Sequence, residues 1–278
     1  MTPLADGYNL ARGEKDVERL RLLNEIYGPG SQALLRQAGL VHGMRVVEIG
    51  CGSGNMTQWL AAQVGPSGSV VALDISEAQV EQARRRAEAA GVSNVTFKVA
   101  DVYAPGLPQE SFDLAHCRLV LMHLTRPVEA LRAVRDLVKP GGAVVCEEMD
   151  LSRWLCEPPS SLMTRSFELK LALSDVRGQH WRIGSGLHRL FLEADLTNPV
   201  VSANSPVVLR GAPKRLLAIS FHTPGKELLA EGLARQEELK AIEAEMERIA
   251  ADDTTLLGLP YMGQVWAVKS PPRSIGSG

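Results

Sequence analysis

The stretch MRVVEIGCGSG (residues 44–54) changes abruptly from branched apolar residues to glycines. Residues 44–49 are too few for a helix and mostly apolar on both faces, which is typical of a buried strand in a parallel sheet. Gly50, Gly52 and Gly54 allow a tight loop without side chains, on which a ligand can lie against the main chain. In the next segment, NMTQWLAAQV, the apolar residues recur at helical spacing. Strand, glycine loop and helix in this order predict the first unit of a nucleotide-binding α/β domain.

The spacing of the glycines narrows the class of nucleotide. The loop reads GxGxG, and Asn55 stands where a dinucleotide fingerprint has its third glycine. A second predicted strand, residues 69–73, ends at Asp74, twenty residues beyond Gly54. A carboxylate at that place can accept hydrogen bonds from both hydroxyls of a ribose. The combination favours an adenosine ligand other than NAD.

The rest of the first half of the chain continues the alternation of strands and helices. Ser76 and Gln79 form a capping-box pattern at the start of the helix that follows Asp74. Strands that alternate with helices in this way form a doubly wound sheet. The further strands are predicted at residues 95–100, 112–117 and 143–147.

Helices are also predicted before and after this series of strands. Two precede it, at residues 14–27 and 31–38, because Gly28-Pro29-Gly30 between them is a strong helix stop. One long charged helix is predicted at residues 226–252, and its apolar face can cover a substrate pocket or form a homodimer surface. Tyr8 is an isolated aromatic in a polar leader, which is either part of a lid over the ligand or a packing element.

Composition restricts the class of protein. With 278 residues and 45% hydrophobic content, the chain can form one sizeable α/β domain. A net charge of -2 gives no electrostatic reason to expect nucleic acid or an anionic membrane as partner. No apolar run is long enough to cross a bilayer and no signal pattern is visible, so a cytoplasmic protein is expected. The four cysteines lack CxxC spacing and are expected to be buried free thiols, with no metal site: Cys51, Cys117, Cys146 and Cys156.

Five segments resemble, in order and spacing, the class I S-adenosylmethionine-dependent methyltransferases: VVEIGCGSG, VVALDIS, VADVY, FDLAHCRLVLMHL and LVKPGG. The similarity covers about residues 44–150, and the leader YNLARGEKDVERLRLL resembles a bacterial small-molecule branch of that family. The resemblance implies a Rossmann-like α/β fold, a doubly wound seven-stranded sheet with an antiparallel last strand, to which residues 200–209 and 261–269 contribute the final two strands. The expected organisation is a helical lid at 1–40, a methyltransferase domain at 41–269 with a helical insertion at 213–253, and a flexible tail at 270–278.

The resemblance also implies a cofactor, S-adenosyl-L-methionine, with S-adenosyl-L-homocysteine as product. Glu48 is then expected to bind the ammonium of the methionine part, because a carboxylate buried in a strand needs such a partner. Asp74 would hold the ribose and Asp101 the exocyclic amine of adenine; for both, the alternative is simple capping of a strand end. The other expected cofactor contacts are Tyr8, the backbone of Gly50, Gly52 and Gly54, Ile75, Gln79, Val102, Cys117 and Arg118.

Three residues are candidates for catalysis. His123 follows the fourth predicted strand, near the expected methyl group, and His180 belongs to the compact group His180-Trp181-Arg182, which suits the wall of a substrate pocket. Either histidine is expected to take the proton if the nucleophile is a hydroxyl, because histidine titrates near neutral pH. Glu148 lies in an acidic cluster, residues 147–150, just past the end of a strand. The competing interpretations are structural histidines, and acidic residues that merely face water.

The expected reaction is an in-line attack by a substrate oxygen, nitrogen or carbon on the sulfonium methyl group, accelerated mainly by alignment in a dry pocket. CRLV stands where amide methylases carry an NPPY-like signature, so a small organic acceptor is favoured over nucleic acid. Two alternative functions are not excluded: a module that binds the cofactor without catalysis, and an enzyme that uses the sulfonium for a rearrangement or decarboxylation. The glycine spacing disfavours a nicotinamide dehydrogenase, and arsenic methylation would require three converging thiolates.

Overall fold

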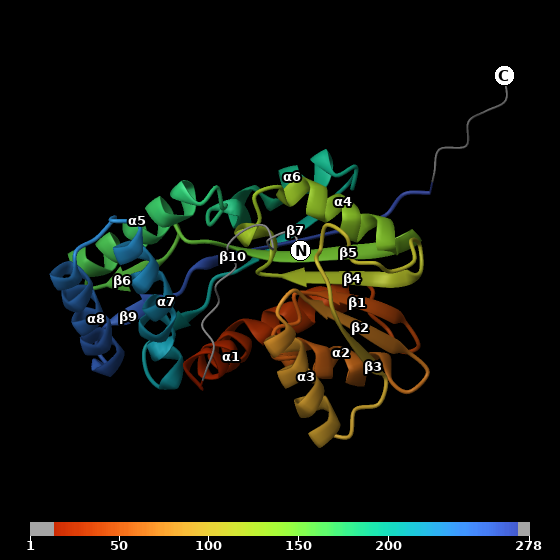
Figure 1. The fold of residues 1–278 in the computed structure, drawn as a ribbon, viewed down its shortest axis with the longest axis horizontal. Helices are drawn as coiled ribbons and strands as arrows, with labels where there is room; N and C mark the ends of the chain where they lie inside the picture. Colours follow the sequence, from red (N-terminus) through yellow and green to blue (C-terminus); the bar gives the residue numbers. More distant parts are fainter. Residues whose placement is uncertain (1–13, 272–278) are drawn as a thin grey trace.

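The computed structural model describes residues 14–271, and its centre is a seven-stranded sheet (Figure 1). The strand order is β3-β2-β1-β4-β5-β10-β7, and β10 runs antiparallel to both of its neighbours while β1 to β5 are parallel. This arrangement confirms the Rossmann-like sheet with an antiparallel last strand. The strands are β1 Arg45–Ile49, β2 Ser69–Asp74, β3 Val95–Val99, β4 Phe112–Arg118, β5 Val138–Asp150, β7 Val200–Asn204 and β10 Tyr261–Val268.

Helices cover both faces of this sheet. In Figure 1, α4 and α6 lie above the strands, and α1, α2 and α3 lie below them. The two layers follow from the crossovers of a doubly wound sheet, which place successive helices on opposite faces. These helices are α1 Glu14–Gln37, α2 Asn55–Val64, α3 Glu77–Ala89, α4 Pro127–Leu137 and α6 Leu187–Glu193.

The central strand, β1, is buried from both sides, and this explains its nearly continuous apolar sequence. Val46 packs into a core cluster with Leu35 of α1 and Leu60 of α2. Val47, whose side chain points to the opposite face, belongs to a second cluster with Leu131 of α4. Since β2 and β4 flank β1 on opposite sides, the strand order reverses there, and the glycine loop leaves β1 at this switch point.

The first helix differs from the prediction. α1 continues through Gly28-Pro29-Gly30, so the prediction of two separate helices is wrong. A Cβ on Gly30 would lie 2.2 Å from Nδ2 of Asn204 on β7, so the absence of a side chain lets the helix pack closely on the sheet. The glycine therefore serves helix packing, and tertiary contacts override the local helix-stop pattern.

A helical cap lies beyond the carboxyl ends of the parallel strands, at the left in Figure 1. It consists of α5 Ser161–Val176, α7 Leu216–Ala230 and α8 Gln236–Ala251, which pack against one another. The prediction of a single helix at residues 226–252 is wrong, because the chain turns between α7 and α8 at Gly232. Its φ of 67° lies in the left-handed region that favours glycine.

A small antiparallel sheet, which the sequence did not predict, joins the cap to the main sheet. Its order is β6-β9-β8, with β6 Leu155–Glu157, β8 Val207–Val208 and β9 Leu256–Gly258. The strand predicted at residues 200–209 is thus divided between the two sheets, as β7 and β8. Across residues 14–271, no helix has both the length and the apolar character that a membrane span requires.

Candidate functional site

Two adjoining cavities lie at the carboxyl ends of the parallel strands. The large cavity, of about 250 Å³, is lined by the glycine loop after β1 and by side chains of α1, α5 and α7. The small cavity, of about 60 Å³, lies among the loops that follow β1, β2, β3 and β4. Both are lined by Gly50, Asp74, Val120 and His123, so one elongated ligand can occupy the two together.

The glycine loop is shaped for the close approach of a ligand. Gly50, Gly52 and Gly54 have φ values of 72°, 52° and 79°, which side chains rarely tolerate. A Cβ on Gly50 would lie 2.2 Å from Cγ2 of Val120, inside the space that the two cavities share. A larger residue at this position would therefore both strain the loop and obstruct the cavities.

Asp74 holds the glycine loop and also lines both cavities. One carboxylate oxygen accepts a hydrogen bond from the backbone N–H of Gly52 at 2.9 Å, and the other accepts one from the N–H of Ser76 at 2.9 Å. The structure therefore shows Asp74 capping the loop and the turn, and the ribose contact stays a prediction. Gln79, in the first turn of α3, lines the large cavity, and its backbone N–H donates to Oγ of Ser76 at 3.4 Å.

The small cavity has the chemistry that an adenine ring requires. Its walls include the apolar side chains of Leu73, Ile75 and Leu124, and Asp101 and Val102 line its far side. One oxygen of Asp101 accepts a hydrogen bond from the backbone N–H of Tyr103 at 2.9 Å. A carboxylate at the edge of an apolar slot can accept from an exocyclic amine, so these residues fit the adenine of the implied cofactor.

Glu48 is a buried carboxylate at the floor of the large cavity. It is 3% exposed and accepts a hydrogen bond from the hydroxyl of Thr57. Burial raises the pKa of Glu48, while the neighbouring His116 and Arg118 act in the opposite direction. A cationic ligand group would favour the ionised carboxylate further, so Glu48 fits the ammonium of a methionine moiety.

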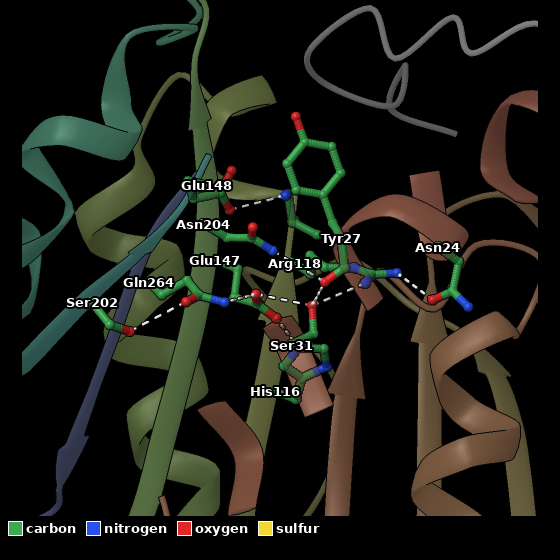
Figure 2. Close-up of polar contacts among 11 residues, drawn as sticks. Asn24, Tyr27, Ser31, His116, Arg118, Glu147, Glu148, Ser202, Asn204 and Gln264 are labelled. Atoms are coloured by element: carbon green, nitrogen blue, oxygen red, sulfur yellow. Dashed lines mark hydrogen bonds and ion pairs between the residues drawn. The ribbon is translucent and has the colours of Figure 1, made fainter. Parts of the chain in front are cut away.

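Arg118 reaches the large cavity from the end of β4 and is anchored to α1 (Figure 2). Its guanidinium donates to Oγ of Ser31 at 3.1 Å and to Oδ1 of Asn24 at 3.2 Å. Ser31 in turn donates to Oε2 of Glu147 at 2.9 Å. Figure 2 shows these contacts as one polar network between α1 and the centre of the sheet, which holds the guanidinium in place.

Glu147 is the anion of this network. Its carboxylate also accepts from Nε2 of Gln264 at 2.7 Å and lies 3.1 Å from Nε2 of His116. Burial acts to raise the pKa of Glu147, but the contacts with His116, Arg118 and Gln264 outweigh it and keep the pKa low. Glu147 is fully buried, as is Glu148, and Asp150 is 3% exposed, so none of the three faces water.

Glu148 lies behind the cavity wall and positions the loop after β4. Its carboxylate accepts hydrogen bonds from the backbone N–H groups of Val120, Leu121 and Met122, at 3.0, 2.7 and 3.2 Å. Burial raises the pKa of Glu148 to about 8, against the effect of these hydrogen bonds. Glu148 does not line either cavity, so the structure does not bring this catalytic candidate to the ligand space.

The two candidate histidines occupy different environments. His123 lines both cavities, and its ring meets that of Trp181 edge to face, with the centroids 6.0 Å apart. Burial, and then the charge of Arg19, lower the pKa of His123 to about 4, so the ring is neutral at neutral pH. His180 is exposed and outside the cavity lining, as is Arg182, which pairs with Asp175 at 2.9 Å. Of the group 180–182, the structure brings only Trp181 to the cavity.

The acceptor end of the large cavity is built from residues that the sequence did not single out. Met149 and Leu151 contribute from the end of β5, and the cap supplies apolar side chains of α5 and α7. The polar residues here are Lys170, Arg177, Gln179, Ser220, Thr223 and Glu227. This second half of the chain carries no motif, and the sequence signal for Lys170 is limited to its place in the largely apolar segment FELKLAL, residues 167–173.

The remaining sequence candidates are placed as follows. Cys117 is fully buried and lies outside both cavity linings, while Cys51 lines the large cavity. Tyr8 lies outside the described residues. Among residues 17–271, whose side chains the structure describes, no group of three or more histidine, cysteine, aspartate or glutamate side chains is arranged to hold a metal ion.

Comparisons with known proteins agree with this geometry. The model of a methyltransferase domain family matches residues 40–194, more than half of the chain. The aklanonic acid methyltransferase DauC of Streptomyces sp. (strain C5) is 35% identical over 124 residues, which are 45% of this chain and 56% of that protein. The ubiquinone/menaquinone biosynthesis C-methyltransferase UbiE of Pseudomonas paraeruginosa is 31% identical over 153 residues, 53% of this chain and 57% of that protein. Each match thus spans little more than half of the relative's length.

Solved structures extend the likeness in fold to most of the chain. The phosphoethanolamine N-methyltransferase 2 of Haemonchus contortus, in complex with phosphomonomethylethanolamine and S-adenosylhomocysteine, has a TM-score of 0.60 at 17% identity. The superposition covers 93% of this chain and 58% of that one. At this identity the likeness shows the fold alone, whereas the family match rests on sequence. The chain therefore belongs to the methyltransferase domain family, in the class I branch that uses S-adenosylmethionine.

Proposed function

We propose that this protein transfers the methyl group of S-adenosylmethionine to a small organic acceptor. One observation carries the proposal: a single cavity joins the glycine loop, Glu48 and Asp74 to an apolar chamber beneath α5 and α7. The first part fits the methionine and ribose of the cofactor, and the second provides room for an acceptor next to it. The printed names of the relatives, with aklanonic acid and quinone biosynthesis, support a small organic acceptor.

The residues of the chain act in this proposal mainly by orientation. The bound cofactor supplies a methyl group on a sulfonium, whose leaving group is already good. Glu48 and Arg118 hold the ammonium and carboxylate of the methionine part, Asp74 holds the ribose, and Asp101 holds the adenine amine. The apolar walls from Met149, Leu151 and the cap exclude water, so the nucleophile is aligned in a dry space.

His123 is the candidate proton acceptor when the nucleophile is a hydroxyl. Its ring is neutral at neutral pH and lies where the two cavities meet, next to the expected methyl group. A neutral imidazole within reach of the hydroxyl can accept the proton as the methyl group is transferred. A low pKa makes it a weak base, so we assign most of the rate acceleration to alignment. The setting of the reaction is the cytoplasm in this proposal.

The proposal is tested with methyl-labelled S-adenosylmethionine and a small-molecule extract of cells that carry the gene. The expected result is a labelled organic product together with an equal amount of S-adenosylhomocysteine. A product that forms without S-adenosylhomocysteine would instead support a rearrangement or decarboxylation. Tight binding of the cofactor without any product would leave only a binding module.

Cofactor choice is tested by calorimetry with S-adenosylhomocysteine and NAD. The wild-type protein should bind S-adenosylhomocysteine more tightly, and Asp74→Ala should weaken this binding by about 1.5–3 kcal/mol, the range for a charge-assisted hydrogen bond. Asp253→Ala is the matched control, because that carboxylate is 62% exposed and its ion pair is with the exposed Arg210. Equal effects of the two substitutions would refute the ribose assignment.

A further inference from the structure

Lys170 is a buried cation in the acceptor part of the large cavity. It lies on α5, three residues after Phe167, and is 5% exposed. Both residues line the cavity, so the lysine stem follows the apolar face of the helix and its ammonium reaches the ligand space. Burial of a lysine at such a place has a cost in free energy, which calls for a compensating partner.

The described residues supply only aromatic faces for this ammonium. Nζ of Lys170 lies 4.6 Å from the ring centroid of Phe167 and 5.2 Å from that of Phe221. Within residues 17–271, whose side chains the structure describes, no hydrogen-bond acceptor or carboxylate pairs with it. Burial lowers the pKa of Lys170 to about 8, so the group is still mostly charged at neutral pH. Two aromatic faces are a weaker partner for a buried charge than a carboxylate is.

Arg177, in the same cavity, is by contrast a cation that pairs with carboxylates. Its guanidinium lies 2.8 Å from a carboxylate oxygen of Glu227 and 3.6 Å from one of Glu231. Both Arg177 and Glu227 line the cavity, so their charges cancel there. Among the described residues, the acceptor part of the cavity therefore carries one positive charge without a carboxylate partner, that of Lys170.

Two further polar atoms at this cavity have no partner within the part of the chain that the structure describes. They are Nε1 of Trp181, a donor, and Oε1 of Gln179, an acceptor, and both are buried. Buried polar groups in native proteins are normally hydrogen-bonded, so unpaired ones at a cavity wall indicate a polar ligand. The ring of Trp181 contacts that of His123, and Nε2 of Gln179 donates to the carbonyl of His123 at 3.2 Å. Since His123 lies where the two cavities meet, both residues are at the cofactor side of the chamber.

We propose that the acceptor is an apolar molecule with an acidic group, a carboxylate or an ionised phenol or enol, which pairs with Lys170. The apolar walls take its hydrocarbon part, and Trp181 and Gln179 hydrogen-bond its polar substituents. This substrate class rests on the proposed methyl transfer, because it assigns the chamber beside the cofactor to the acceptor. A neutral or cationic acceptor would leave the lysine charge buried and uncompensated.

The test compares an aromatic acid with its neutral amide. Full-length protein saturated with S-adenosylhomocysteine is titrated with naphthoate and with naphthamide, and binding is followed by calorimetry. Wild-type protein should bind naphthoate on the order of 10-fold more tightly or better, the range expected for a charge-assisted contact in a water-poor site. Equal affinities, or no binding of naphthoate at millimolar concentration, would overturn the proposal.

Variants assign the preference to one side chain. Lys170→Met keeps the length and apolar stem, and should bind naphthoate only as well as naphthamide, with naphthamide affinity unchanged. Lys170→Arg should keep the preference, and Lys240→Met, on the exposed face of α8, is the matched control. Unchanged affinity for S-adenosylhomocysteine shows that the variants are folded. A preference that survives in Lys170→Met refutes the assignment.

The same titrations separate this proposal from the proposed function. Protein that binds S-adenosylhomocysteine but does not distinguish the acid from the amide keeps the cofactor assignment and loses the anion site. Protein that fails to bind S-adenosylhomocysteine, yet prefers naphthoate through Lys170, keeps the anion site and loses the proposed methyl transfer.

Discussion

Ser31→Ala should destabilise the protein by about 2–3 kcal/mol, because this hydroxyl links the buried carboxylate of Glu147 to the half-buried guanidinium of Arg118. Ser31 is fully buried, donates to Glu147 at 2.9 Å and accepts from Arg118 at 3.1 Å. Hydrogen bonds to charged groups contribute about 1.5–3 kcal/mol each. The two together would contribute about 3–6 kcal/mol. Glu147 keeps its contacts with His116 and Gln264, so the expected loss lies at or somewhat below the lower end of that range.

Urea denaturation measures this loss as a lower midpoint at an unchanged m-value. Ser111→Ala is the control, since its hydroxyl donates to the carbonyl of Pro108 in an exposed hydrogen bond, and a change within about 0.5 kcal/mol is expected. Affinity for S-adenosylhomocysteine should also fall in Ser31→Ala, because Arg118 loses one of its two anchors on α1. If Ser31→Ala were as stable as wild type, the network in Figure 2 would not hold α1 to the sheet.

The remaining predictions concern the cavity walls and the N-terminal segment. Gly50→Ala should abolish measurable binding of S-adenosylhomocysteine in calorimetry, because its Cβ would lie 2.2 Å from Cγ2 of Val120; near-normal affinity would contradict the fit. For Glu148, with a folded pKa near 8 against an ordinary 4.5, the folded state retains a proton that the unfolded state releases, so stability falls as pH rises through this window. Thermal unfolding at several pH values should show the free energy of unfolding falling by at most about 1.4 kcal/mol per pH unit, and this fall should be smaller in Glu148→Gln. If wild type and Glu148→Gln lost stability equally with pH, the assignment to Glu148 would be refuted. His123→Ala should lower turnover by about 10²–10⁴-fold if His123 takes a proton, and a retained rate and pH profile would exclude that role. Deletion of residues 1–13 should weaken cofactor binding if Tyr8 closes over the site, whereas unchanged affinity would show that the leader has no such role.

The cofactor half of the site could be predicted because its signals are local. The strand, glycine loop and helix around residues 45–64 depend on neighbouring residues in the sequence, and the structure places Glu48, Gly50 and Asp74 around one cavity. Parallel strands bring their carboxyl ends together whatever their distance along the chain. Asp101, after β3, therefore also arrived at the expected edge.

The acceptor half could not be predicted, because it depends on contacts between distant segments. The ring of Phe221 from α7 lies 5.2 Å from Nζ of Lys170 on α5, and nothing in the sequence near either residue predicts that contact. The three consecutive residues of the group 180–182 turn to different sides, so only Trp181 reaches the cavity. Glu148 lies at the expected strand end, yet three backbone N–H groups direct its carboxylate away from the ligand space.

A crystal structure with bound S-adenosylhomocysteine tests the central claim most directly. The account predicts adenine in the small cavity beside Asp101, ribose hydroxyls within hydrogen-bond distance of Asp74, and the methionine ammonium at Glu48. The sulfur should then face the chamber that contains Trp181 and Lys170. Density for the ligand outside these cavities, or in them with its sulfur turned away from that chamber, would contradict the account.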